Sequence, residues 1–363
     1  VALLREQSNH TGAYEIRGLV AAQAGDYSAA ARHFRSALDH AAKRSPATLA
    51  NLAEALLRLN QPEQVIEALN EAIEIAPDYA IAWGKLAIVQ RGLGRSDEAL
   101  KTLTRGLEQV PDDPELSGIL AGLLISLQRP AEAVPHLYCA LERAPNIDDH
   151  WIYLYRLLLI GFLPVDRAGA ILLKALEHSL IRPAMVAPSI AVSLAQSPQI
   201  AELMEQVNGG GGLDVSELAG QLAILEKNEL LLALMAVGPV PNPAFEKLFT
   251  VLRRSIALAD DIGSIFAAAP RFLVALANQA FLTEYAWQAT DPEIERVEQL
   301  VSAYDVSAAS EAEIVMIACF RPLNSLSVAD AIRDRKWSDE LQPLIRMQVV
   351  EPYFEQQLRA DIP

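Results

Sequence analysis

Three prolines at a fixed spacing constrain the fold of this chain more than any other feature of its sequence. Pro77, Pro111 and Pro145 lie 34 residues apart and close the similar segments "EAIEIAPDYA", "RGLEQVPDDP" and "CALERAPNID". A period of this length indicates structural repeats, each a pair of antiparallel helices that buries its apolar face only against its neighbours. The spacing therefore predicts a stack of helix pairs.

Small and large residues recur in phase with these prolines. Each expected second helix carries a small or β-branched residue, a large one and a small one, as needed where two helices cross closely. These triplets are Ala30, Phe34 and Ala37, then Val65, Leu69 and Ala72, then Ala99, Leu103 and Gly106, then Ala133, Leu137 and Ala140. Trp83 and Trp151 stand two periods apart in the first helices of their units. Four units are clear, and a fifth, from Asp149 to about Leu180, is degenerate.

These positions resemble the tetratricopeptide repeat family over about half of the chain. The resemblance implies a right-handed superhelix in which the first helices line a concave groove that binds peptides or protein surfaces. Three positions depart from the family pattern and weaken single units: Arg17 stands where an apolar residue is usual, Ala42 replaces the first terminal proline, and Val65 replaces a small residue.

A groove of this kind predicts a set of candidate binding residues on the first helices. The candidates are Asn51, Glu54, Arg58, Lys85, Ile88, Arg91 and Arg156. Three arginines and a lysine favour an acidic protein or peptide segment, because guanidinium groups pair bidentately with carboxylates. The alternative is an ordinary solvated helix surface. The family's clamp for C-terminal carboxylates needs paired Lys and Asn, and Ala50 with Glu54 and Gly84 with Ile88 occupy the comparable places, so that role is not supported.

Composition and charge narrow the fold class and the partners. Ala and Leu dominate without alternating β-branched tracts, so we expect an all-α protein: the repeat superhelix followed by a second helical domain. The net charge of -16 repels phosphate backbones and anionic lipids, so we expect neither nucleic acid nor membrane as a partner. Cys139 and Cys319 lie far apart in apolar runs, which favours free thiols in a reducing, cytoplasmic compartment.

The repeat phase is lost beyond Ile181. A glycine run at 209–212 and the segment "GPVPNP" at 238–243 mark two breaks. We therefore expect repeats in residues 1–180, a helical connector in 181–243 and a helical domain in 244–363. The glycine run is expected to be a linker, because no Gly-Lys-Ser/Thr or G-x-G-x-x-G pattern accompanies it.

The last part of the chain carries a second resemblance. The phrases "LFTVLRR", "FLVALANQAFLTEYAW", "CFRPLNSL" and "VVEPYFEQQLRADIP", within residues 245–363, resemble the helical segment of bacterial tetratricopeptide proteins fused to a class I S-adenosylmethionine-dependent methyltransferase. The resemblance implies a methyltransferase domain, with its S-adenosylmethionine cofactor, after a segment like this one. We expect no cofactor within these residues, because no strand with a glycine-rich turn and acidic ribose ligand occurs in them.

Other catalytic patterns are missing from the sequence as well. There is no His-Glu-x-x-His, no paired cysteine spacing and no G-x-S-x-G turn. His136 and Cys139, three residues apart, are expected to pack together rather than bind a metal. Three hypotheses follow: the non-catalytic part of a protein methyltransferase that selects its substrate, a free-standing interaction scaffold, or, least favoured, an enzyme complete within this chain.

The polar residues inside the run "PRFLVALANQAFLTEYAWQATDPE" are predicted to be structural. Asn278, Gln279 and Glu284 interrupt an apolar helical pattern, and buried polar groups require hydrogen-bond partners. We expect all three to bind helix ends or neighbouring side chains. Phe281 is expected to lie in the core beside them.

Overall fold

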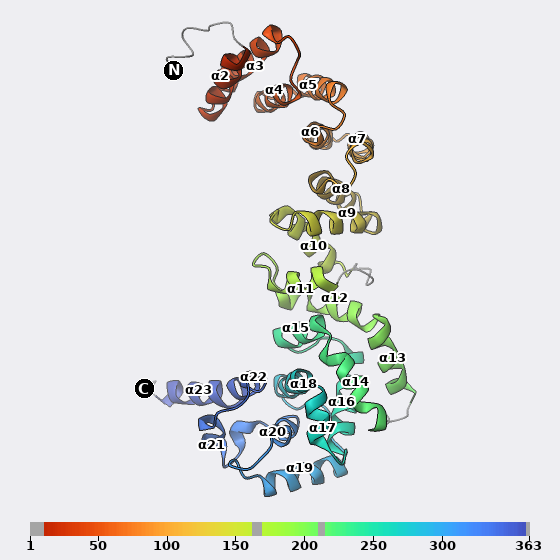
Figure 1. The fold of residues 1–363 in the computed structure, drawn as a ribbon, viewed down its shortest axis with the longest axis vertical. Helices are drawn as coiled ribbons and strands as arrows, with labels where there is room; N and C mark the ends of the chain where they lie inside the picture. Colours follow the sequence, from red (N-terminus) through yellow and green to blue (C-terminus); the bar gives the residue numbers. More distant parts are fainter. Residues whose placement is uncertain (1–10, 162–168, 210–214, 361–363) are drawn as a thin grey trace. The chain divides into compact units, whose positions relative to one another are not determined.

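The computed structural model describes residues 11–161, 169–209 and 215–360, with no strand among them. Contacts group the chain into two compact units, residues 1–157 and 158–363. The all-α prediction is confirmed (Figure 1). The three-part division with boundaries after residues 180 and 243 stays a prediction. Of the glycine run at 209–212, only Gly209 lies among the described residues, and it follows the helix that ends at Asn208.

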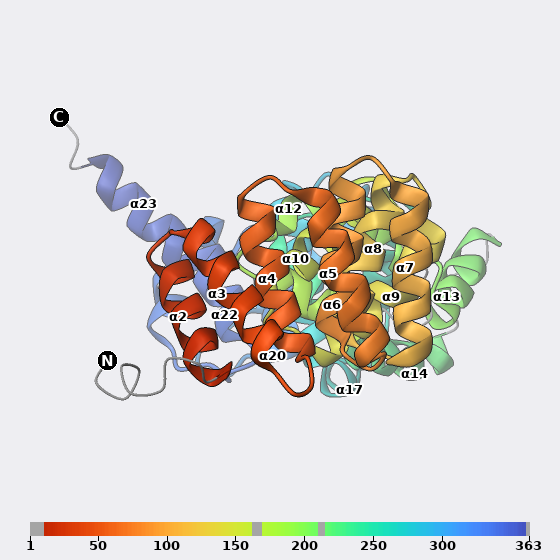
Figure 2. The ribbon, with the colours of Figure 1, turned by 90° about the horizontal axis from the view of Figure 1, so that it is seen from above.

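Unit 1 is a stack of helix pairs. The pairs are α2 (Thr11–Gln23) with α3 (Tyr27–His40), α4 (Pro46–Arg58) with α5 (Pro62–Ile75), α6 (Ala80–Gly92) with α7 (Ser96–Gln109), and α8 (Pro114–Ser126) with α9 (Pro130–Arg143), followed by α10 (Asp148–Leu159). The second helices α3, α5 and α7 also contact the first helix of the next pair. Figure 2 shows these pairs displaced stepwise from α2 to α9. The predicted repeat period is thus the period of the stack.

The turn inside each pair has the same geometry in successive repeats. Asn60, Gly94 and Gln128 take the left-handed backbone conformation, with φ of 56°, 76° and 58°. The amide that follows each of them donates to a carbonyl five residues earlier, at 2.8–3.0 Å. These bonds satisfy the last carbonyls of the first helix, so the turn ends it at the same repeat position.

The predicted crossing residues form the core of unit 1. The triplet Ala30, Phe34 and Ala37 is at most 1% exposed, and its counterparts Leu69, Leu103 and Leu137 are fully buried. Trp83 and Trp151 are both 3% exposed. Their indole Nε1 atoms donate to the carbonyls of Pro77 and Pro145 at 2.8 and 2.7 Å, so each tryptophan ties its helix to the proline that closes the preceding unit.

Unit 2 is built from helices of unequal length around α18. These are α11 (Gly169–Glu177), α12 (Pro183–Ala195), α13 (Pro198–Asn208), α14 (Val215–Glu226), α15 (Glu229–Val237), α16 (Pro243–Ala257), α17 (Ile262–Ala268), α18 (Pro270–Leu282), α19 (Asp291–Ala303), α20 (Glu311–Ala318), the 3₁₀ turn η1 (Leu323–Ser325), α21 (Ala329–Asp334), α22 (Gln342–Ile345), the π-helical turn η2 (Arg346–Val350) and α23 (Glu351–Ala360). Helix α18 contacts α14, α15, α17, α20, α22 and η2. It therefore forms the centre of the second core.

The polar residues of α18 behave differently from one another. Gln279 is 1% exposed; its Nε2 donates to the carbonyls of Met235 and Gly238, and its Oε1 accepts from the amide of Val240. Its predicted structural role is confirmed, because it forms hydrogen bonds with backbone groups at the end of α15 and in the turn after it. The prediction was wrong for Asn278, whose buried Oδ1 has no hydrogen-bond partner in the described part of the chain.

Two further expectations for this segment need correction. Glu284 is exposed, with φ of 52° in the turn after α18, and its side chain makes no hydrogen bond to the described residues. Phe281 is half-buried, whereas Phe272 is fully buried. The helical period placed both phenylalanines inside, but Phe281 lies next to the last residue of α18, Leu282, and its ring is only partly covered.

A buried ion pair fixes the loop that follows α18. The Arg253 side chain is 1% exposed and that of Glu293 is fully buried. Arg253 donates to the carbonyls of Trp287 and Gln288 and lies 3.4 Å from Glu293 Oε1. Burial lowers the pKa of Arg253; for Glu293, burial raises the pKa but hydrogen bonds from Thr290 and Arg254 give a net lowering. Both groups are therefore held charged inside the unit.

Within the described ranges, no single helix is long and apolar enough to cross a bilayer, although the bent pair α17 and α18 passes the length and composition test when taken together.

Candidate functional site

The seven predicted groove residues all lie on first helices of unit 1. Asn51, Glu54 and Arg58 are on α4, Lys85, Ile88 and Arg91 on α6, and Arg156 on α10. Asn51, Arg58, Ile88, Arg91 and Arg156 are exposed, and Glu54 and Lys85 are half-buried. The exposure of these side chains leaves them available to a ligand.

The structure brings Glu54, Arg58 and Lys85 together. Glu54 Oε1 accepts from Arg58 Nε at 3.2 Å, and Glu54 Oε2 accepts from Lys85 Nζ at 2.7 Å. The hydrogen bond from Lys85 is the main cause that lowers the pKa of Glu54. The carboxylate therefore neutralises part of the basic surface, and the cluster of three keeps one net positive charge.

A small apolar hollow lies beside this ion-paired cluster. Its volume is about 100 Å³, and Leu57, Val65, Leu69 and Ile88 line it together with Glu54 and Lys85. Leu57 is 40% exposed and Ile88 42% exposed, one on each of two consecutive first helices. We call Glu54, Leu57, Arg58, Lys85 and Ile88 the α4–α6 patch. The patch combines apolar surface with a fixed positive charge.

No ion pair or hydrogen bond joins the Arg91 or Arg156 side chain to this patch within the described residues. The repeat spacing explains why: Arg58, Arg91 and Arg156 occupy three different positions of the repeat, with Arg91 equivalent to Leu57 and Arg156 equivalent to Glu54. No ion pair of either arginine occurs within the described residues. Whether these arginines and Asn51 contact a ligand stays a prediction.

Close packing shapes the same surface further along the stack. A Cβ atom added to Gly118 would lie 2.2 Å from His150 Nε2, and one added to Gly122 would lie 2.4 Å from Tyr153. These glycines of α8 are therefore covered by side chains of α10. The sequence spacing carried no signal for this aromatic cover.

Sequence reasoning also missed some exposed apolar residues on the first helices. Ile81 on α6 is 45% exposed and Ile152 on α10 is 38% exposed. Only their position in the sequence could have predicted them, because each lies one helical turn before a predicted groove residue. Ile81 precedes Lys85 by four residues, and Ile152 precedes Arg156 by four.

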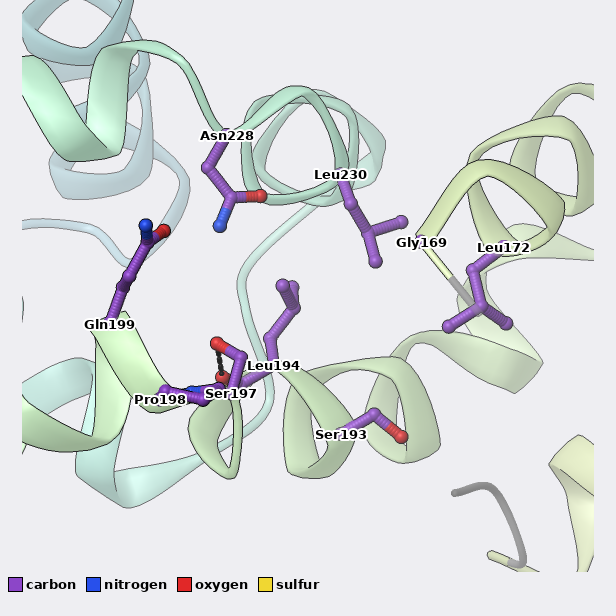
Figure 3. A pocket seen from close by; sticks show the side chains of 9 residues that line it. All are labelled: Gly169, Leu172, Ser193, Leu194, Ser197, Pro198, Gln199, Asn228 and Leu230. Carbon is purple, nitrogen blue, oxygen red and sulfur yellow. Dashed lines mark hydrogen bonds between the residues drawn. The ribbon is translucent and has the colours of Figure 1, made fainter. Parts of the chain in front are cut away.

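A larger cleft occurs within unit 2, and two of its polar side chains bind backbone groups at helix ends. Figure 3 shows this cleft, about 360 Å³ in volume, between α11, α12 and the start of α15. Ser197 Oγ donates to the Leu194 carbonyl at 2.7 Å, and Asn228 Oδ1 caps α15 by accepting from the Leu231 amide at 3.0 Å. These residues end one helix and begin another, so the cleft is explained by helix packing.

No group of three His, Cys, Asp or Glu side chains within the described ranges is arranged to hold a metal ion. His136 and Cys139 are half-buried, and burial lowers the pKa of His136. Cys319 is a buried free thiol, and burial raises its pKa to about 12. A thiol in this state is a poor nucleophile.

Comparison with known proteins supports the repeat assignment. The tetratricopeptide repeat family model matches residues 21–87 and 60–123. One similar solved structure is MamA, with 20% sequence identity, coverage of 40% of this chain and 84% of that chain, and a TM-score of 0.36. A second is YrrB, a TPR protein with an unusual peptide-binding site, with 22% identity, coverage of 40% of this chain and 75% of that chain, and a TM-score of 0.34. A third is a thermophilic TPR protein of Thermus thermophilus, with 22% identity, coverage of 51% of this chain and 98% of that chain, and a TM-score of 0.36.

No curated protein matches the sequence closely enough to count as a relative. The helix pairs, the shared turn geometry and the buried crossing residues agree with the family match over residues 21–123. Residues 21–123 of this chain are thus similar to tetratricopeptide repeats in both sequence and helix arrangement.

Proposed function

We propose that unit 1 is a non-catalytic scaffold that binds a protein or peptide segment at the α4–α6 patch. The observation that carries the proposal is the pairing of exposed Leu57 and Ile88 around one hollow, with Lys85 and Arg58 held beside them by Glu54. An apolar hollow next to fixed charges suits an aliphatic side chain flanked by carboxylates. The partner is therefore an acidic segment with an aliphatic anchor.

The energetics require several contacts to act together. Exposed ion pairs contribute only about 0.2 to 1 kcal/mol each, whereas micromolar affinity corresponds to about 8 kcal/mol. Burying apolar surface at Leu57 and Ile88 must supply much of the difference, at about 25 cal/mol per Å². Affinity should fall with salt, yet persist, since only the ionic part is screened.

The proposal is tested by selecting random peptides on the full chain. We expect the selected peptides to share Asp or Glu beside an aliphatic residue. Leu57→Asp and Lys85→Glu should each weaken a selected peptide at least about tenfold, because one places a charge in the hollow and the other reverses the charge at its edge. Lys101→Glu is the control: this exposed lysine lies on α7, a second helix, and makes the same change of charge. Selection of basic peptides, or equal loss with Lys101→Glu, would contradict the proposal.

The wider role rests on the resemblance of residues 245–363. We infer from it that the scaffold selects substrates for a class I S-adenosylmethionine-dependent protein methyltransferase in the bacterial cytoplasm; the alternative is a free-standing adaptor. The net charge of -16 supports a protein partner rather than nucleic acid or an anionic membrane. The gene sequence beyond Pro363 tests this inference: a strand with a glycine-rich turn favours the methyltransferase, and its absence favours the adaptor.

A further inference from the structure

A second cleft in unit 2 follows one face of α18. Its volume is about 500 Å³, and α18 contributes Arg271, Val274, Ala275 and Asn278 to its lining. Residues at this spacing share one side of a helix. Helix α15 contacts α18, as do α22 and η2, and residues of both groups also line the cleft. This size lies within the range of small-molecule sites.

The cleft contains a buried amide with an unused hydrogen-bonding atom. Asn278 is 7% exposed, and its Oδ1 atom has no hydrogen-bond partner in the part of the chain that the structure describes. The adjacent Gln279, in contrast, makes three hydrogen bonds. Buried polar atoms in proteins are rarely left unpaired. Because Oδ1 is buried, it can accept from a donor in the cleft only after a half-turn about the last torsion of Asn278, which places the Nδ2 group in the buried position instead.

The walls beside Asn278 are apolar and adaptable. Met235 on α15 and Met347 on η2 line the cleft with Val274. Thioethers adjust to ligand shape and pack favourably against aromatic rings. The π-helical turn that carries Met347 is fixed by Gln348, whose Nε2 donates to the Ala277 carbonyl and whose Oε1 accepts from the Leu323 amide. Such turns frequently occur at functional sites.

The charges at the edge of the cleft favour a cation. Asp339 and Glu340 line it and are both exposed. Arg271 lines it too, but its guanidinium group pairs with Glu229 through two hydrogen bonds of 2.8 and 2.6 Å. Neither Asp339 nor Glu340 forms an ion pair within the described residues, so these two carboxylates attract a positively charged group.

We propose that this cleft binds a small amphipathic cation: an apolar, preferably aromatic body with one N–H donor and an amino group. The body packs against Met235, Met347 and Val274, the N–H pairs with Asn278, and the amino group lies near Asp339 and Glu340. This site is independent of the α4–α6 patch, since all of its residues belong to unit 2.

Three probes separate the contributions of shape, hydrogen bonding and charge. Tryptamine has the aromatic body, the ring N–H and the cation; tryptamine methylated on the ring nitrogen lacks the N–H; indolepropionate keeps the ring N–H and has the opposite charge. Binding to the full chain is measured by calorimetry and NMR shifts. We expect tryptamine to bind at least about fivefold more tightly than the methylated probe and about tenfold more tightly than indolepropionate.

Variants of the cleft assign each preference to its residue. Asn278→Leu should abolish the preference for the N–H, and Asp339→Asn with Glu340→Gln should abolish the preference for the cation. Ala275→Phe should block all three probes by filling the cleft. Gln221→Leu is the control, because Gln221 is another buried amide with an unpaired oxygen and does not line this cleft. The exposed carboxylate variants keep the test valid even if Asn278→Leu fails to fold.

Two outcomes would overturn the proposal. One is the absence of tryptamine binding to the unmodified chain at about 1 mM, a concentration that corresponds to about 4 kcal/mol. The other is unchanged binding by Ala275→Phe, which would place the probe elsewhere.

Discussion

Lys85 Nζ lies 2.7 Å from Glu54 Oε2 and so links the first helices of two consecutive repeats. Glu54 is bound in addition by Arg58 of its own helix. One carboxylate thus holds two cations in fixed positions across a repeat boundary. Glu54 therefore sets the net charge of the α4–α6 patch.

Replacing the carboxylate should strengthen binding at the patch. In Glu54→Gln, Lys85 and Arg58 lose their internal partner and become available to an acidic peptide. We expect the selected peptide to bind severalfold more tightly at low salt, with a steeper salt dependence, because its carboxylates no longer compete with Glu54. Fluorescence anisotropy across a salt series measures this. Weaker binding by Glu54→Gln would show that Glu54 itself contacts the peptide.

The same residue predicts a small pH effect on stability. The pKa of Glu54 is lowered in the folded state, so its stabilising contribution is present above the unfolded pKa and is lost as pH falls through the folded pKa. These side chains are substantially exposed, so we expect at most about 1 kcal/mol. Unfolding in urea at pH 6 and pH 3 should show a smaller decrease for Glu54→Gln than for the unmodified chain; an equal decrease contradicts the assignment.

Two phenylalanines of α18 provide a matched comparison of burial. Phe272→Ala removes a fully buried ring and should destabilise unit 2 by about 3 to 5 kcal/mol. Phe281→Ala removes a half-buried ring and should cost clearly less. Urea unfolding followed by circular dichroism measures both. A larger effect at Phe281 would mean that the end of α18 is covered more fully than the structure indicates.

The buried ion pair predicts a strong asymmetry between neighbouring arginines. Arg253→Met leaves the buried Glu293 without one partner and frees two loop carbonyls, so we expect a loss of about 3 to 5 kcal/mol. Arg254→Met is the control, since this side chain is 40% exposed although it also binds Glu293. The free energies of unfolding in urea distinguish the two; equal losses would show that the exposed Arg254 supports Glu293 as much as the buried Arg253 does.

The turns inside the repeats predict opposite effects of two substitutions. Gln128 adopts φ of 58°, so Gln128→Gly relieves about 1 to 2 kcal/mol of strain and costs about 0.5 to 1 kcal/mol of chain entropy. We expect a net gain of about 0.5 kcal/mol. Gly94→Ala, at the equivalent turn, should cost about 1 kcal/mol. Thermal unfolding measures both changes, and a gain from Gly94→Ala would exclude this explanation.

The sequence by itself identified the repeats and most of their core. The positions of Pro77 and Trp83 recur at multiples of the repeat period, and Phe34 occupies the large position of its crossing triplet. This period predicts helix pairs because each unit packs only on its neighbours. It also identified Gln279 as structural, since a buried amide needs partners.

Only the tertiary structure decided which polar residues meet. Glu54 and Lys85 are 31 residues apart, and their contact depends on how two helices are set side by side. Gln279 forms hydrogen bonds to residues more than 38 positions away in the sequence. Its neighbour Asn278 lines a cleft, and its buried oxygen is unpaired within the described residues. Local sequence fixes the helical face on which a side chain stands, but the other wall of every site comes from a distant segment. Packing between those segments therefore decides whether a polar residue is satisfied or left for a ligand.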